Sequence, residues 1–152
     1  MPPYFSWIED HVLAASAQPF HHSHMQYLRS HGIHLIVNID TDILPNSSLF
    51  KHVCFSIAEL CYPTFEQIID FINLVLAARD HDEPVLIQSI RGQGTLAIFI
   101  ACYLAVRWTC SAEVTINSLI KMRPASFDND IQKANVKHFV TYWHKCHSQL
   151  NI

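Results

Sequence analysis

One segment, residues 84–99, constrains the fold of this chain more than any other. It reads PVLIQSIRGQGTLAIF, which is an apolar run typical of a buried strand, a loop with two glycines, and an apolar run typical of a buried helix. A loop that leaves the carboxyl end of a parallel strand and begins a helix points backbone N–H groups and the positive end of the helix dipole at one place. The segment therefore predicts an anion-binding loop. A plain strand-to-helix turn remains an alternative, because GxG matches neither the dinucleotide nor the Walker pattern.

The segment's own strand and several further strands are expected from the sequence. Residues 34–39 and 85–88 form short apolar runs, and Val53, Phe55 and Ile57 alternate with polar or small residues. Two more short strands joined by a turn are expected within residues 4–15. The runs at 34–39 and 85–88 resemble strands that are buried on both faces, which is usual in a parallel sheet.

Helices are expected between and after these strands. A capping box at Thr64 and Gln67 predicts a helix that ends before Pro84. Further helices are expected at residues 26–30, 94–108 and 111–122, and Asp128 is expected to cap the last one. This alternation predicts an α/β fold with a central, mostly parallel twisted sheet of four to five strands flanked by helices.

The length and composition indicate one domain, residues 1–152. Half of the 152 residues are apolar, which suffices for one core. A net charge of -3 with ten scattered Lys and Arg argues against a nucleic-acid surface. No apolar run approaches the roughly 20 residues of a membrane span, and the start of the chain lacks the pattern of a signal peptide. We therefore expect a cytoplasmic or nuclear protein that binds neither nucleic acid nor membrane.

The cysteines and histidines indicate neither a disulfide framework nor a metal site. The five cysteines are odd in number, have no CxxC spacing and mostly lie in apolar runs, where a free Cys packs as a small apolar residue. His21, His22 and His24 have no Cys or carboxylate cluster at zinc spacing, so a polar helix start explains them equally well. We expect no metal and no cofactor.

Motifs along nearly the whole chain carry a family resemblance. Beyond the loop they are FSW at residues 5–7, HGIHLIV at 31–37, the loop and helix start at 57–67, ACYL at 101–104, RPAS at 123–126, and Gln132. In this order they resemble the small atypical dual-specificity protein phosphatases of the cysteine-dependent tyrosine phosphatase superfamily. The resemblance implies the fold of that family, a phosphate-binding loop at residues 89–95, and protein or phosphoprotein partners.

The residues that perform the chemistry in that family are replaced here. The family signature is His-Cys, five residues, then Arg followed by Ser or Thr. By the resemblance, Ser89 stands at the nucleophilic cysteine, Thr95 at the phosphate-clamping arginine and Gln88 at the histidine before the nucleophile. Glu59 stands near the general-acid aspartate, where it is either an acid or a solvated loop carboxylate.

These substitutions predict loss of catalysis. A cysteine at a helix N-terminus can have a pKa of about 3.5–7.5 and attack as a thiolate, whereas a serine needs a neighbouring base. The Gln88 amide cannot act as that base, and a threonine hydroxyl cannot replace a bidentate guanidinium. We expect a catalytically inactive pseudophosphatase that binds a protein or phosphoprotein segment through the loop residues Ser89, Ile90, Arg91, Gly92, Gln93, Gly94 and Thr95.

Two alternatives and several properties stay open. The protein is a weak or atypical phosphatase if a histidine from elsewhere in the chain activates Ser89 and Arg91 supplies the positive charge. It is an interaction protein with a vestigial loop if partners bind another face. Arg91 either reaches a bound anion or turns to a carboxylate or to solvent. The sequence identifies neither the partner nor the oligomeric state.

Overall fold

The computed structural model describes residues 1–19, 21–39, 49–57 and 61–148. Within these ranges the chain forms one five-stranded sheet and five helices. Their order along the chain is β1 (Ser6–Glu9), β2 (Leu13–Ala17), α1 (His22–Ser30), β3 (Leu35–Asn38), β4 (Lys51–Cys54), α2 (Phe65–Asp80), β5 (Val85–Ser89), α3 (Thr95–Trp108), α4 (Ala112–Met122) and α5 (Asp130–Ser148). Glu59, for which the sequence left the roles of an acid and of a solvated carboxylate open, lies outside the described residues.

The sheet is mostly parallel, as predicted. Its strand order is β1-β2-β5-β3-β4, and only the β1–β2 pair is antiparallel. All five residues of β5 are buried, because this strand lies at the centre with parallel neighbours on both sides. The carboxyl ends of β2, β5, β3 and β4 therefore lie at one edge of the sheet, and the glycine-containing loop begins at that edge.

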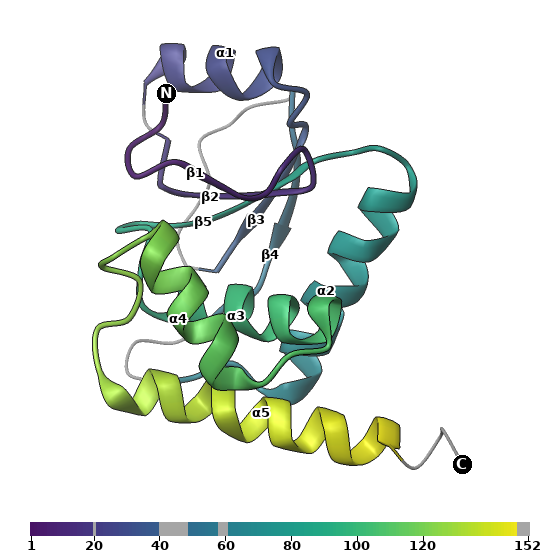
Figure 1. The fold of residues 1–152 in the computed structure, drawn as a ribbon. Coiled ribbons are helices and arrows are strands. Elements are labelled where there is room, and N and C mark those ends of the chain that lie inside the picture. Colours follow the sequence, from purple (N-terminus) through teal and green to yellow (C-terminus); the bar gives the residue numbers. More distant parts are fainter. Residues whose placement is uncertain (20, 40–48, 58–60, 149–152) are drawn as a thin grey trace.

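Helices cover both faces of the sheet (Figure 1). Leu28 of α1 packs on one face against Ala14, Ile36 and Leu86. The other helices cover the opposite face, where α3 lies at the centre of the larger core. Every α3 residue from Leu96 to Ala105 is buried, which explains why this helix is apolar on all sides.

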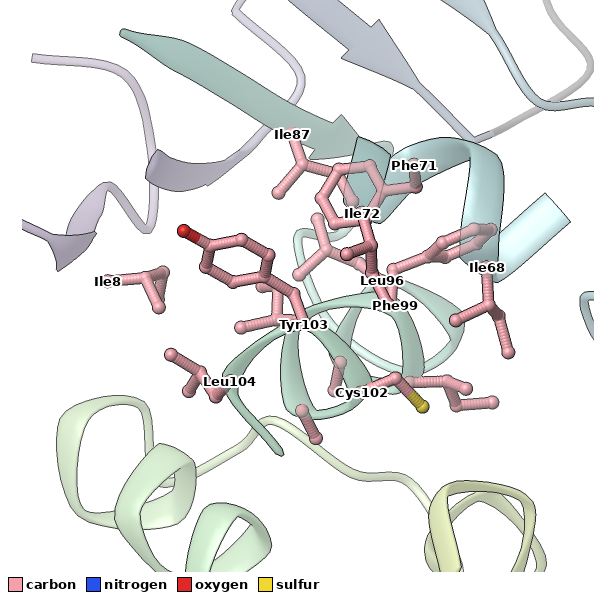
Figure 2. Packing of buried hydrophobic residues seen from close by; sticks show 14 of the residues in the cluster. Ile8, Ile68, Phe71, Ile72, Ile87, Leu96, Phe99, Cys102, Tyr103 and Leu104 are labelled. Atoms are coloured by element: carbon pink, nitrogen blue, oxygen red, sulfur yellow. The ribbon is translucent and has the colours of Figure 1, made fainter. Parts of the chain in front are cut away.

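Figure 2 shows how α3 packs in the larger core. Leu96, Phe99 and Tyr103 of α3 lie close to Ile87 of β5 and to the aromatic ring of Phe71 on α2. The Phe71 ring meets the Phe99 ring at a centroid distance of 5.4 Å, nearly edge to face. This packing fixes the start of α3, and therefore the end of the glycine-containing loop, relative to the sheet.

Three element boundaries differ from the sequence-based expectations. α1 begins at His22 rather than near Gln26, because the side chains of His21 and His24 form a capping box. The strand expected over Val53, Phe55 and Ile57 is instead Lys51–Cys54. Its pairing with β3 ends at Asn38 and Cys54, so the apolar alternation continues beyond the end of the sheet.

The third difference concerns the last helix, where the expectation that Asp128 is the cap was wrong. Asn129 directly precedes α5, and its Oδ1 accepts a hydrogen bond of 2.9 Å from the amide of Gln132. An amide oxygen in this position satisfies one of the free N–H groups of the first turn. The Asp128 carboxylate lies elsewhere, beside the glycine-containing loop.

The cysteines are less buried than their apolar surroundings suggest. Cys102 is buried on α3, and burial raises the pKa of its thiol well above the usual value. Cys54, Cys61 and Cys146 are exposed. Among the described residues, no helix is long and apolar enough to cross a membrane, and no group of three or more His, Cys, Asp and Glu is placed to hold a metal ion.

Candidate functional site in the loop between β5 and α3

The glycine loop, defined here as residues 89–95, joins the last residue of β5 to the first residue of α3. Both of its glycines have positive φ, +72° at Gly92 and +80° at Gly94, where side chains are unfavourable. A Cβ on Gly92 would lie 2.5 Å from the backbone nitrogen of Ala17. Gly92 is therefore required both for its own conformation and for the close passage of the loop along β2.

Ser89 lies at the start of the loop and is 6 % exposed. Its Oγ accepts a hydrogen bond of 2.9 Å from the amide of Gly92. Within the described part of the chain, no histidine ring or carboxylate forms a hydrogen bond with this hydroxyl. The base that the atypical-phosphatase alternative needs is therefore not found next to Ser89 in the described ranges.

Several backbone donors of the loop point to no protein acceptor. The amide of Gly94 donates a hydrogen bond of 2.7 Å to the carbonyl of Ser126 and is therefore not available to a ligand. The amides of Arg91, Gln93 and Thr95 donate to no group in the described ranges. Gly94 is the N-cap of α3 and brings no side chain to its free amides. Uncapped amides at a helix N-terminus are the usual donors to a bound anion.

Arg91 turns to a carboxylate, which is one of the three destinations that the sequence left open. Its Nη2 lies 2.7 Å from Oδ2 of Asp128. The two side chains are 61 % and 32 % exposed. Oδ2 of Asp128 is also the atom that a Cβ on Gly94 would meet, at 2.6 Å. The Asp128 carboxylate thus lies against both the cationic side chain and the backbone of the loop.

A second arginine, Arg123, supports the loop from inside the protein. It is 1 % exposed, and its Nη2 donates a hydrogen bond of 2.6 Å to the carbonyl of Gly92. Its Nη1 donates to the carbonyls of Tyr4 and Ala15 and to the hydroxyl of Ser6. Burial lowers the pKa of Arg123 to about 10, so the guanidinium is still charged near neutral pH.

Gln88 points away from the loop. Successive residues of a strand face opposite sides of the sheet, so Gln88 and Ser89 lie on different faces. Gln88 is 2 % exposed, and its Oε1 has no hydrogen-bond partner among the described residues. Among the described residues, Gln88 forms no hydrogen bond with the Ser89 hydroxyl.

The structure brings together most of the predicted site and adds residues that the sequence did not suggest. Ser89, Arg91, Gly92, Gly94 and Thr95 form one loop, whereas Glu59 lies outside the described residues. Asp128, Arg123 and Ser126 were missed as loop contacts. The only signal for them is the RPAS motif and its neighbouring Asp128, because contacts across 31 to 37 positions leave no periodic pattern.

Comparisons with solved structures identify the fold. PTPMT1 superimposes with a TM-score of 0.83 at 16 % identity, over 95 % of this chain and 99 % of that one. A mouse putative dual specificity phosphatase complexed with zinc tungstate gives 0.83 at 15 % identity, over 97 % and 92 %. A variant of human DUSP28 gives 0.81 at 15 % identity, over 95 % and 99 %.

These structural similarities establish the fold, and a match to a family model shows which family the chain belongs to. The model for the DSP-PTPase phosphatase domain of Swiss Army Knife proteins, PTP-SAK, matches residues 2–137. That range includes the five strands, the glycine loop, and the segment with Arg123 and Asp128. The chain therefore belongs to the dual-specificity phosphatase-like domains of the PTP-SAK family.

Proposed function

We propose that this protein is a pseudophosphatase, which binds a phosphorylated protein segment at the glycine loop and does not hydrolyse it. The observation that carries the proposal is the environment of Ser89. By the resemblance, its hydroxyl stands at the position of the family's nucleophile, and it accepts a hydrogen bond from the amide of Gly92 and forms no hydrogen bond with a histidine or carboxylate among the described residues. A neutral hydroxyl without a base is a poor nucleophile.

The replacement at Thr95 removes a second requirement of phosphoryl transfer. A guanidinium binds two phosphoryl oxygens at once and stabilises the charge that develops in the transition state. Losing one preorganised donor in an enzyme's electrostatic site typically reduces the rate by about 100- to 1,000-fold. Here a full positive charge is lost together with the thiolate, so two independent changes act against turnover.

The same loop keeps the groups needed for weak binding. The amides of Arg91, Gln93 and Thr95 are available as donors, and the dipole of α3 points its positive end at them. Each such hydrogen bond contributes about 1–1.5 kcal/mol, so the three of them correspond to a dissociation constant in the low millimolar range. Complexes of related folds support a phosphate-like ligand, since the mouse protein was solved with zinc tungstate and PTPMT1 with PI(5)P.

The test is a titration of the folded protein with matched peptides that carry phosphotyrosine, phosphothreonine or no phosphate. The proposal predicts binding of the phosphorylated peptides with dissociation constants near 1 mM, and no binding of the unphosphorylated ones. Chemical shifts of the Arg91, Gln93 and Thr95 amides should change during the titration. Equal binding of phosphorylated and unphosphorylated peptides, without shifts in the loop, would indicate a vestigial loop instead.

The activity of the protein is tested in parallel with a standard phosphatase substrate. The proposal predicts no burst and no turnover above background. The atypical-phosphatase alternative predicts a burst of product that disappears in Ser89→Ala, because the serine would then form a covalent intermediate. The Ser111→Ala variant is a matched control, since this exposed serine only caps α4, far from the loop in sequence.

A further inference from the structure

A negative charge, the carboxylate of Asp128, lies at the edge of the glycine loop. Asp128 pairs with Arg91, which carries the loop's positive side-chain charge, at 2.7 Å. The same carboxylate oxygen lies against Gly94, the residue that precedes the free amides of α3. A carboxylate in this place repels any oxyanion that approaches these donors, and it also pairs with the cationic side chain of the loop.

The carboxylate is held there by its own backbone. The amide of Asp128 donates 2.7 Å to Oε1 of Gln132, and the carbonyl of Ser126 accepts a hydrogen bond from the amide of Gly94. The Gln132 side chain also lies near Gly94, 3.2 Å from the position that a Cβ would take. Residues 126–128 therefore run along the loop, and Asp128 is placed at its edge rather than being a freely rotating surface group.

We propose that Asp128 is an autoinhibitory group of the glycine loop, and that a ligand binds by exchanging partners with the Arg91–Asp128 pair. The phosphate of the ligand forms an ion pair with Arg91, and a basic residue of the ligand forms an ion pair with Asp128. This inference rests on the proposed function, because it specifies the ligand of the same loop. It names the ligand class as a phosphorylated segment with a Lys or Arg close to the phosphorylated residue.

The exposure of the pair makes such an exchange feasible. Arg91 is 61 % exposed and Asp128 32 % exposed, so solvent and salt screen their attraction. Exposed ion pairs of this kind are opened at little cost, which corresponds to an effect of about two- to fivefold on a binding constant. A ligand that satisfies both charges loses nothing by separating them, whereas inorganic phosphate satisfies only Arg91 and leaves Asp128 unpaired.

The chain contains a matched control for this charge. Asp130 lies two residues further along and is fully exposed, with Lys133 at 3.9 Å as its partner. Asp128→Asn and Asp130→Asn remove the same charge from the same short segment, but only the first removes it from the loop. A general effect of net charge would therefore change both variants equally.

The experiment follows the loop amides by NMR in the full chain at constant ionic strength, during titration with inorganic phosphate. Asp128→Asn should bind phosphate about two- to fivefold more tightly than the wild type, and Asp130→Asn should match the wild type. If Asp128→Asn does not fold, Asp128→Ser takes its place. Equal affinities in wild type and Asp128→Asn, or equal gains in both variants, would overturn the inference while leaving loop binding intact.

A second titration tests the ligand class with two phosphopeptides that differ only in basic or acidic residues beside the phosphate. The wild type and Asp130→Asn should prefer the basic peptide, and Asp128→Asn should lose most of that preference. An unchanged preference in Asp128→Asn contradicts the exchange of partners. If neither phosphate nor any phosphopeptide shifts the loop amides in any folded variant, loop binding itself is wrong, and this outcome is distinct from the failure of Asp128 alone.

Discussion

Arg123 and Gly92 are joined by a hydrogen bond of 2.6 Å, from a fully buried guanidinium to a carbonyl of the glycine loop. The same guanidinium also donates hydrogen bonds to the hydroxyl of Ser6 on β1 and to the carbonyl of Ala15 on β2, so one side chain connects the loop to the first two strands. The Arg123 guanidinium lies 3.8 Å from the centre of the Tyr4 ring, a favourable stacking contact. The shape of the loop therefore depends on a residue that does not belong to it.

Arg123→Met should destabilise the protein strongly. The substitution keeps much of the apolar stem but removes a donor from the buried carbonyls of Ala15 and Gly92, and each lost donor costs about 1–3 kcal/mol. We expect a total loss on the order of 3 kcal/mol or more in the free energy of unfolding, measured by urea denaturation. Arg29→Met, on the exposed side of α1, is the control and should change stability by less than about 0.5 kcal/mol. Similar changes in the free energy of unfolding for both variants would show that the hydrogen bonds of Arg123 do not stabilise the fold.

Alanine substitutions at Gly92 and Gly32 distinguish the cost of a left-handed backbone conformation from the cost of a steric clash. Both have positive φ, but a Cβ on Gly32 would meet its nearest atom at 4.0 Å, whereas one on Gly92 would lie 2.5 Å from Ala17. Gly32→Ala should therefore lose only about 1–2 kcal/mol for the left-handed conformation. Gly92→Ala should lose clearly more and should shift the amides of β2 and of the loop in NMR spectra. Equal losses in urea denaturation are the contrary result.

Tyr103 should make the protein less stable in alkaline solution. Burial raises the pKa of Tyr103 above its usual value of 10.0, and the neighbouring Glu9 carboxylate, which accepts its hydroxyl proton at 3.2 Å, raises it further. Above about pH 10 the unfolded chain loses this proton while the folded chain keeps it, so the free energy of unfolding falls as pH rises.

The size of this effect is measured by comparison with Tyr103→Phe. The wild type should lose stability relative to the variant by up to about 1.4 kcal/mol per pH unit above pH 10. Arg123, whose pKa is lowered to about 10, titrates in the same range, but it is present in both proteins and cancels in the difference. Parallel curves of unfolding free energy against pH for the two proteins would contradict the buried neutral state of Tyr103.

The order of elements was predictable because local patterns specify it. The apolar run after Gly94 predicts a buried helix, and its burial from Leu96 to Ala105 confirms this. The capping box of Thr64 and Gln67 is present at the predicted place, with both hydrogen bonds formed. Such features depend on neighbours within a few positions, which a single sequence displays directly.

The contacts around the loop were not predictable in the same way. Asp128 is a residue type that often caps helices. Only the fold reveals that Asn129 caps α5, whereas Asp128 pairs with Arg91, 37 positions away. The role of Arg123 is hidden for the same reason, since its partners come from β1, β2 and the loop. Tertiary placement decides between the alternative partners of a charged side chain, and periodicity carries no information about it.

We propose that this protein lacks turnover because, by the resemblance, Ser89 and Thr95 stand where the family has its thiol and its guanidinium. This proposal is tested most directly by measuring hydrolysis of a standard phosphatase substrate by the wild type, by Ser89→Ala, and by Ser89→Cys combined with Thr95→Arg. The account predicts background rates for the first two and measurable hydrolysis for the double variant, with Gln88→His added if the thiol needs support. Hydrolysis by the wild type that disappears in Ser89→Ala would contradict it.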